Sequence, residues 1–194
     1  MVKATADAEP WRQSYERMIQ FLLDQKAPVY GIGEQSHITF ANFSTPEKTW
    51  KHLQRFARFG LPLRISEFDI EIPDNDSPEQ IAWRDDALRD ALTLYFSHPQ
   101  IENVTLWGFW EGRHWKPKTA FWDQNWQLRP HGKVFLDLVY RQWWTDVTMV
   151  ANDGGEIRGR GFLGDYEVEV RHGSRSEIVP VTLTKAGLDF KVVL

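Results

Sequence analysis

Apolar and polar positions along residues 11–143 predict a regular succession of helices and strands. A first helix is indicated by apolar residues at helical spacing, namely Trp11, Tyr15, Met18 and Leu22. Three strands are expected next, each followed by a helix, in Val29–Gly33, Leu63–Ile72 and Ile101–Phe109. This even spacing is typical of βαβ units in a parallel sheet with right-handed crossovers.

The helix starts carry their own signals. Ser44 with Glu47, and Ser77 with Gln80, match the capping-box spacing, each with a proline in the first helical turn. A final helix is expected over Pro130–Trp143. The sequence therefore predicts helices between the strands and after the last of them.

The central predicted strand, Leu63–Ile72, is apolar enough to be buried on both faces of a parallel sheet. Glu67 and Asp69 nevertheless lie near its carboxyl end. Burial disfavours a charged carboxylate, and active sites of α/β sheets and barrels form at this end of the strands. The two carboxylates thus indicate a candidate site, although surface acids at a fraying strand end are an equally ordinary interpretation.

From Thr145 onward the pattern changes to short alternating segments separated by turn residues. The expected strands are Thr145–Val150, Ile157–Phe162, Tyr166–Arg171, Glu177–Leu183 and Leu188–Val193. Glycine-containing turns such as His172–Gly173 separate them. We therefore expect an α/β domain over residues 1–144 and a small antiparallel sheet or sandwich over residues 145–194.

The composition argues against several classes of function for this chain. The chain is globular, with 42% hydrophobic and 26% charged residues, and its net charge of −4 argues against a nucleic-acid partner. No apolar run is long enough to span a bilayer, and no signal peptide is recognised. There is no cysteine, and the six histidines include no HExxH, so neither a metal nor another cofactor is expected.

Two further motifs carry candidate chemistry. Gly31–His37 reads GIGEQSH, where a GxG without a third glycine is a weak phosphate signal and a close approach to the next strand is the better account. His37 is a ligand, a residue that orients a carboxylate, or a structural histidine. Trp107 and Trp115 flank a glycine-containing loop, so they are either core residues or ring faces that line a groove.

Taken together, GIGEQSH, ISEFDI and LWGFWEGRHW resemble, in order and spacing, three successive strand ends of glycoside hydrolase family 10. That family consists of endo-β-1,4-xylanases on a (β/α)₈ barrel. The resemblance covers roughly Trp11 to Trp143 and implies the sixth to eighth strands. It therefore implies a partial (β/α)₈ barrel of about three βα units, followed by a small antiparallel all-β appendage.

The resemblance also implies roles for individual residues. Glu67 matches the nucleophile of a retaining glycosidase, and His37 matches the histidine that hydrogen-bonds it, with Asp69 behind. The polar group and the aromatic walls near the reacting sugar are matched by Gln35, Trp107 and Trp115. Arg113, in the same loop as the two tryptophans, is a further expected substrate-binding residue.

The departures from the family are equally informative. The family's acid/base glutamate follows an asparagine on its fourth strand, and no Asn-Glu pair occurs in this chain. Glu34 and Glu111 are the nearby carboxylates that a replacement would have to use. The expected protein is thus a xylanase-like part-barrel with half of an active site, acting on β-1,4-xylan or xylo-oligosaccharides.

The same resemblance sets the expected partners and location. The remaining barrel strands would come from a missing amino-terminal portion, from a separate chain, or from a second copy of this chain in a homodimer. The parent protein is expected to be extracellular or periplasmic. Two alternatives stay open, namely a non-catalytic carbohydrate-binding protein of the same fold, and an interaction module that works through its β tail.

Overall fold

The computed structural model describes residues 9–194, which form two compact units that meet at Leu136 and Asp137. The sequence places the domain boundary slightly later, at Trp144, and that boundary stays a prediction. The elements of the first unit are α1 (Glu9–Asp24), β1 (Ile32–Glu34), β2 (His37–Thr39), α2 (Pro46–Ala57), β3 (Leu63–Glu71), α3 (Pro78–Ser97), β4 (Ile101–Leu106), two short 3₁₀ helices η2 (Glu111–Arg113) and η3 (Pro117–Thr119), and α4 (Pro130–Asp137). The second unit contains the π-helix η4 (Leu138–Gln142), β5 (Gly164–His172) and β6 (Arg175–Leu183).

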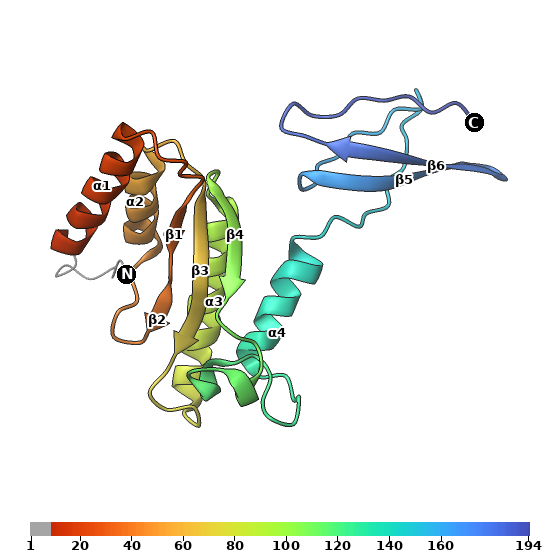
Figure 1. Ribbon diagram of the computed structural model, residues 1–194. Helices are drawn as coiled ribbons and strands as arrows, with labels where there is room; N and C mark the ends of the chain where they lie inside the picture. The colour runs from red at the N-terminus through yellow and green to blue at the C-terminus, as the bar shows by residue number, and fades with distance from the viewer. Residues whose placement is uncertain (1–8) are drawn as a thin grey trace. The chain divides into compact units, whose positions relative to one another are not determined.

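The first unit is built on a parallel sheet in which β3 is central. β1 and β2 pair with successive parts of β3 on one side, and β4 pairs with it on the other. Figure 1 shows β1, β3 and β4 side by side and pointing the same way. The prediction of an α/β fold with a parallel sheet is confirmed.

The first predicted strand, Val29–Gly33, is wrong in its bounds. The chain turns before it, where the Val29 amide donates to the Ala27 carbonyl, and Tyr30 is exposed. Pairing with β3 begins only at Ile32 and is interrupted once, because Ser36 adopts a left-handed φ of 65°. The third strand likewise ends at Leu106 rather than Phe109.

A bulge in β3 places its carboxylates on the face opposite Ile65. Ile65 lies opposite Val104 of β4, and Phe68 lies opposite Leu106, so β3 has one extra residue between them. The bulge shifts the side-chain alternation of the strand by one position. Ile65 is therefore buried with residues of α2 and α3, and Phe68 beyond the bulge packs edge-on against Tyr95 of α3.

The helix starts follow the predicted signals with one shift. Ser77 caps α3 as expected, since its hydroxyl accepts from the Gln80 amide. At α2 the cap is Thr45, not the predicted Ser44, and the Thr45 hydroxyl accepts from the Lys48 amide. With the cap at Thr45, Pro46 occupies the first helical position. The amide hydrogen that proline lacks would have no partner within the helix at this position.

The remaining predicted helices are present. α1 covers the first apolar stripe, and the last predicted helix, Pro130–Trp143, forms as α4 and continues into the π-helix η4. None of the helices within residues 9–194 combines the length and the apolar character that a bilayer span requires.

The second unit contains an antiparallel hairpin of β5 and β6, paired from Gly164 with Leu183 to His172 with Arg175. Gly173 opens the two-residue turn with a φ of 60°, as the turn signal predicts. The other three predicted strands, in residues 145–150, 157–162 and 188–193, are wrong, because the described chain has no regular structure there. Apolar residues of these segments, including Val147, Val150 and Val193, are exposed and cover no sheet face.

Candidate active site

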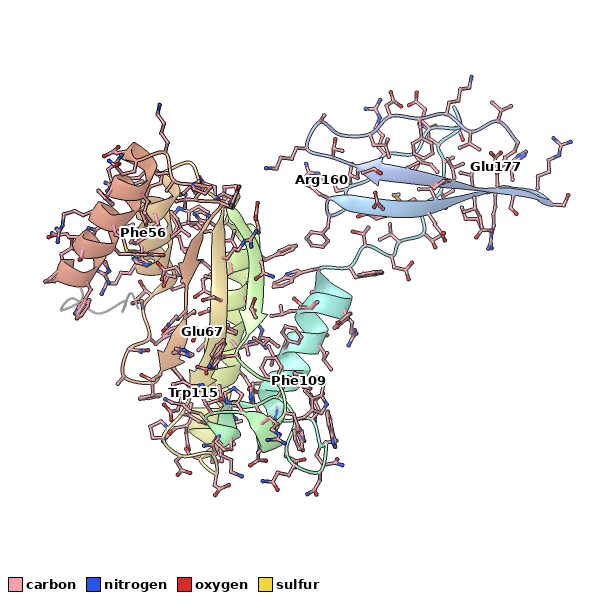
Figure 2. The ribbon with its side chains drawn as sticks, in the orientation of Figure 1. Phe56, Glu67, Phe109, Trp115, Arg160 and Glu177 are labelled. Carbon is pink, nitrogen blue, oxygen red and sulfur yellow. The ribbon has the colours of Figure 1, made fainter. Side chains whose placement is uncertain are left out.

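The sheet brings the three predicted catalytic residues together at its carboxyl end. His37 opens β2 directly opposite Asp69 of β3, and Glu67 lies two residues earlier on β3. Both carboxylates contact the same imidazole because residues two positions apart on a strand point to the same face. Figure 2 shows Glu67 and Trp115 at this end of the first unit.

A chain of hydrogen bonds connects these side chains. His37 Nε2 lies 3.0 Å from Glu67 Oε2, and His37 Nδ1 lies 2.9 Å from Asp69 Oδ1. The second oxygen of Asp69 accepts from Trp115 Nε1 at 2.8 Å. The Asp69 side chain is only 3% exposed, whereas that of Glu67 is 22% exposed. The chain therefore fixes the histidine from a buried anchor and leaves Glu67 reachable from outside.

The backbone supports the same arrangement. The Glu67 amide donates to the Gln35 carbonyl at 3.0 Å, and the Asp69 amide donates to the Ser36 carbonyl. The Ser36 hydroxyl forms a 2.7 Å hydrogen bond with the Tyr95 hydroxyl of α3, which ties the left-handed residue to the helix layer. Burial raises the pKa of Tyr95 to about 12, so this hydroxyl keeps its proton at any ordinary pH.

Two tryptophans lie beside the histidine, as predicted. The ring centroids of Trp115 and Trp107 are 4.9 Å and 6.4 Å from that of His37. Both rings are about half exposed, at 55% and 46%. They are therefore not core residues, and they present apolar faces next to Glu67, which suits stacking against a sugar ring.

The loop that carries Trp115 is tied to the end of β3. Lys116 pairs with Glu71 and also lies 4.8 Å from the centroid of the Trp115 ring. With the bond from Trp115 to Asp69, two successive loop residues are thus bound to alternate carboxylates of one strand. No local sequence signal marks the Lys116–Glu71 pair, because its members are far apart in the chain.

Gln35 and Arg113 are less clearly placed. The Gln35 Oε1 atom is buried and has no hydrogen-bond partner among the residues that the structure describes. Arg113 ends the η2 helix with an exposed side chain, which forms no hydrogen bond or ion pair within the described part of the chain. Substrate binding by these two residues stays a prediction.

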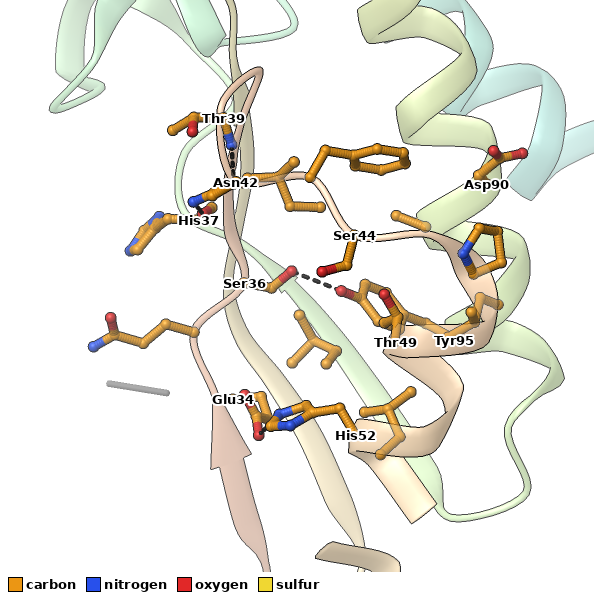
Figure 3. A pocket seen from close by; sticks show the side chains of 18 of the residues that line it. Glu34, Ser36, His37, Thr39, Asn42, Ser44, Thr49, His52, Asp90 and Tyr95 are labelled. Atoms are coloured by element: carbon orange, nitrogen blue, oxygen red, sulfur yellow. Dashed lines mark hydrogen bonds and ion pairs between the residues drawn. The ribbon is translucent and has the colours of Figure 1, made fainter. Parts of the chain in front are cut away.

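A pocket of about 370 Å³ lies where β1 and β2 meet α2 and α3. Figure 3 shows that His37 lies on one side of the β1–β2 backbone, while Glu34 points the other way, toward His52 of α2. Glu34 Oε1 lies 2.7 Å from His52 Nε2, and the Glu34 side chain is buried. Glu34 is thus directed into the helix layer and away from His37.

Glu111, the other candidate acid, is also bound by neighbouring donors. Its carboxylate accepts from Arg129 at 2.5 Å, from Lys118 at 3.1 Å and from the Gln124 amide. Burial alone would raise the pKa of Glu111, but the hydrogen bond from Lys118 and the charge of Arg129 bring it below its usual value. A carboxylate with a lowered pKa is a poor proton donor, so Glu111 is not suited to be a replacement acid.

His114, in the loop between Trp107 and Trp115, has a packing role. It is buried against Gly108 and its ring lies 3.1 Å from the Thr119 hydroxyl. A β-carbon at Gly108 would come within 2.5 Å of this ring, so only glycine fits there. Burial lowers the pKa of His114, which keeps the buried ring neutral at pH 7.

Comparison with known proteins gives a consistent result. The profile of glycosyl hydrolase family 10 matches residues 4–137. Endo-1,4-beta-xylanase 2 of Arabidopsis thaliana is 29% identical over 188 residues, which is 97% of this chain and 17% of the plant protein. Anti-sigma-I factor RsgI6 of Acetivibrio thermocellus is 31% identical over 155 residues, 79% of this chain and 19% of that protein. The chain thus spans about a fifth of the length of these relatives.

Solved structures agree at the level of the fold. Native xylanase 10B from Thermotoga maritima has a TM-score of 0.58 and 25% identity, over 65% of this chain and 41% of that one. The family profile ends at residue 137, whereas the match to the plant xylanase covers 97% of the chain. The unit that contains β5 and β6 is therefore included in the similarity to the plant protein.

Proposed function

Because this chain belongs to glycosyl hydrolase family 10, we propose that its first unit forms three βα units of a xylanase barrel and carries the nucleophile half of a retaining active site. The observation that carries this proposal is the hydrogen-bonded chain of Glu67, His37 and Asp69 at the carboxyl end of the parallel sheet. Active sites of (β/α)₈ enzymes are built at that end.

In this proposal Glu67 attacks the anomeric carbon of a xylosyl residue. The new bond joins a Glu67 oxygen to that carbon, and the bond from the carbon to the leaving-group oxygen breaks. His37 and Asp69 are positioning residues, which hold the carboxylate of Glu67 at a fixed angle to the sugar. The rings of Trp107 and Trp115 stack on the sugar and exclude water.

The leaving-group oxygen still needs a proton from a second carboxyl group, which retaining enzymes place about 5 Å from the nucleophile. Glu34 is hydrogen-bonded to His52 and Glu111 is paired with Lys118 and Arg129, which makes both residues unsuitable as donors. We infer that the acid belongs to other barrel strands, in the same polypeptide or in a separate chain. The outer edges of β1 and β4 are unpaired within residues 9–194 and are where such strands would add.

A second candidate is sugar binding without hydrolysis. The lack of a suitably placed acid favours it, and so does the similarity to a protein named as an anti-sigma factor rather than as an enzyme. Binding of xylan without turnover, even after the remaining barrel strands are supplied, would identify this function. Secretion of the parent protein stays a prediction under either candidate.

The direct test is a titration of the chain with xylohexaose by calorimetry. We expect measurable binding that Trp107→Ala weakens by roughly tenfold, since a stacked ring contributes on the order of 1.4 kcal/mol. Trp144→Ala, which removes an exposed tryptophan (65%) from the second unit, is the matched control and is expected to bind normally. No xylohexaose binding by a folded sample would contradict the proposal.

A further inference from the structure

A second group of aromatic side chains lies in the segment between β4 and α4. The rings of Trp110 and Trp126 are stacked, with centroids 5.4 Å apart and planes within 11° of each other. The Phe109 ring lies 6.3 Å from that of Trp126. Trp126 and Phe109 are 58% and 52% exposed. We call these three residues the aromatic platform; none of them hydrogen-bonds to Glu67, His37 or Asp69 among the contacts of the described residues.

The platform is held by a short hairpin whose tip carries Trp126. Trp122 and Leu128 form the antiparallel bridge that closes the hairpin. Asp123 Oδ1 accepts from the amides of both Asn125 and Gln127 at 2.8 Å, so the tip is fixed from within. The hairpin therefore holds the Trp126 ring in one place without help from a ligand.

Tryptophan is an unusual residue for the backbone conformation at the tip of the hairpin. Trp126 has a φ of 62°, a region that favours glycine or asparagine and costs a bulky side chain about 1 kcal/mol. The strain is not offset by full burial, because more than half of the ring surface is exposed. Stacking on Trp110 contributes about 1 kcal/mol, which only balances the strain, so tryptophan at this position adds little net stability to the hairpin.

The hairpin residues beside Trp126 are polar amides, and the exposed Arg113 lies three residues after Trp110. Gln124, Asn125 and Gln127 are all exposed and present amide donors and acceptors beside the ring. The carboxylate of Asp123 accepts backbone amides of the hairpin, and Arg129, three residues after Trp126, is paired with Glu111. A flat aromatic face surrounded by neutral amides suits a ligand with an apolar face and many hydroxyls.

We propose that the aromatic platform is an accessory binding site for a neutral pyranose chain. The outer face of Trp126 stacks against a sugar ring, and the three amides bind its hydroxyls. In Figure 2, Phe109 of the platform lies toward α4, whereas Trp115 lies toward Glu67. The site goes beyond the proposed hydrolase function and does not rest on Glu67 as a nucleophile.

The test measures binding of insoluble neutral xylan by the full chain, in a Trp107→Ala background that weakens binding beside Glu67. Adding Trp126→Gly is expected to weaken the remaining binding by roughly tenfold. Glycine is unstrained at this φ, so the variant is expected to unfold at an unchanged or higher temperature. Trp126→Tyr, which keeps a ring, is expected to retain most of the binding.

Trp11→Ala is the matched control, because Trp11 is also a largely exposed tryptophan, on α1. Equal xylan binding with and without Trp126→Gly would overturn the proposal that the aromatic platform binds xylan. It would not contradict the proposed site beside Glu67. The converse, in which Trp126→Gly weakens binding and Trp107→Ala does not, would support the platform while contradicting the proposed cleft. A self-association that Trp126→Gly abolishes, without any change in xylan binding, would make the platform a contact between copies and also overturn the proposal.

Discussion

Replacing Asp69 by alanine is expected to lower the free energy of unfolding by about 2–4 kcal/mol, because two donors then lose their acceptor. His37 Nδ1 and Trp115 Nε1 both bind the Asp69 carboxylate, whose side chain is 3% exposed. The same change frees the His37 ring to rotate away from Glu67. Chemical denaturation measures the loss of stability.

The Asp69→Ala change is expected to affect the reactivity of Glu67 more strongly than the free energy of unfolding. A misplacement of about 1 Å at a reacting group costs on the order of 10²-fold in rate, so covalent labelling of Glu67 by an activated xyloside should slow by that factor. Asp86→Ala is the control, since Asp86 is a 76% exposed carboxylate on α3 paired only with Arg89. Its expected effect is within about 0.5 kcal/mol. An Asp69→Ala protein as stable and as reactive as wild type would show that the carboxylate anchors nothing.

Glu111→Gln is expected to destabilise the first unit by roughly 3 kcal/mol. The change removes the charge that pairs with Arg129 and Lys118, and breaking a buried ion pair leaves an uncompensated charge. We place the expected loss of stability at the low end of the range for buried ion pairs. The Lys118 side chain is 63% exposed, so water solvates part of its charge once Glu111 is neutral. Glu102→Gln, which removes an exposed partner of Arg64, is the matched control.

The same residue gives a pH dependence with a defined sign. The pKa of Glu111 in the folded protein lies below its usual 4.5, so its ionised form is favoured by folding. Its contribution to stability is present above about pH 4.5 and is lost as the pH falls through the lowered value. Thermal unfolding between pH 7 and pH 3 should therefore show a smaller acid-induced loss for Glu111→Gln than for wild type. Parallel curves for the two proteins would assign the acid sensitivity to other carboxylates.

Much of the first unit follows from local pattern. Strand-forming residues of Leu63–Ile72, the Ser77 cap and the regular spacing of the strands were enough to predict a parallel sheet with helices between its strands. The meeting of His37 with Asp69 follows from the same topology, since carboxyl ends of parallel strands share one edge. These features depend on residues that are neighbours in sequence or in adjacent strands.

Other features depend on contacts that leave no local signal. The bulge in β3 is defined by its pairing with β4, and the hydrogen bond between Ser36 and Tyr95 joins two residues far apart in the chain. The three wrong strands of the second unit failed because alternation predicts a strand only where another surface covers its apolar face. Exposed Val150 and Val193 show that no such surface covers them in the described unit.

The most direct test of the account is the intact mass of the protein after incubation with a 2-fluoro xylobioside that carries a dinitrophenyl leaving group. This leaving group departs without a proton, so the reaction depends on the nucleophile and not on a proton donor. The account predicts a stable adduct that peptide mapping places on Glu67 and that Glu67→Gln abolishes. A folded sample that forms no adduct, or forms it on another residue, would contradict the assignment of Glu67 as the nucleophile.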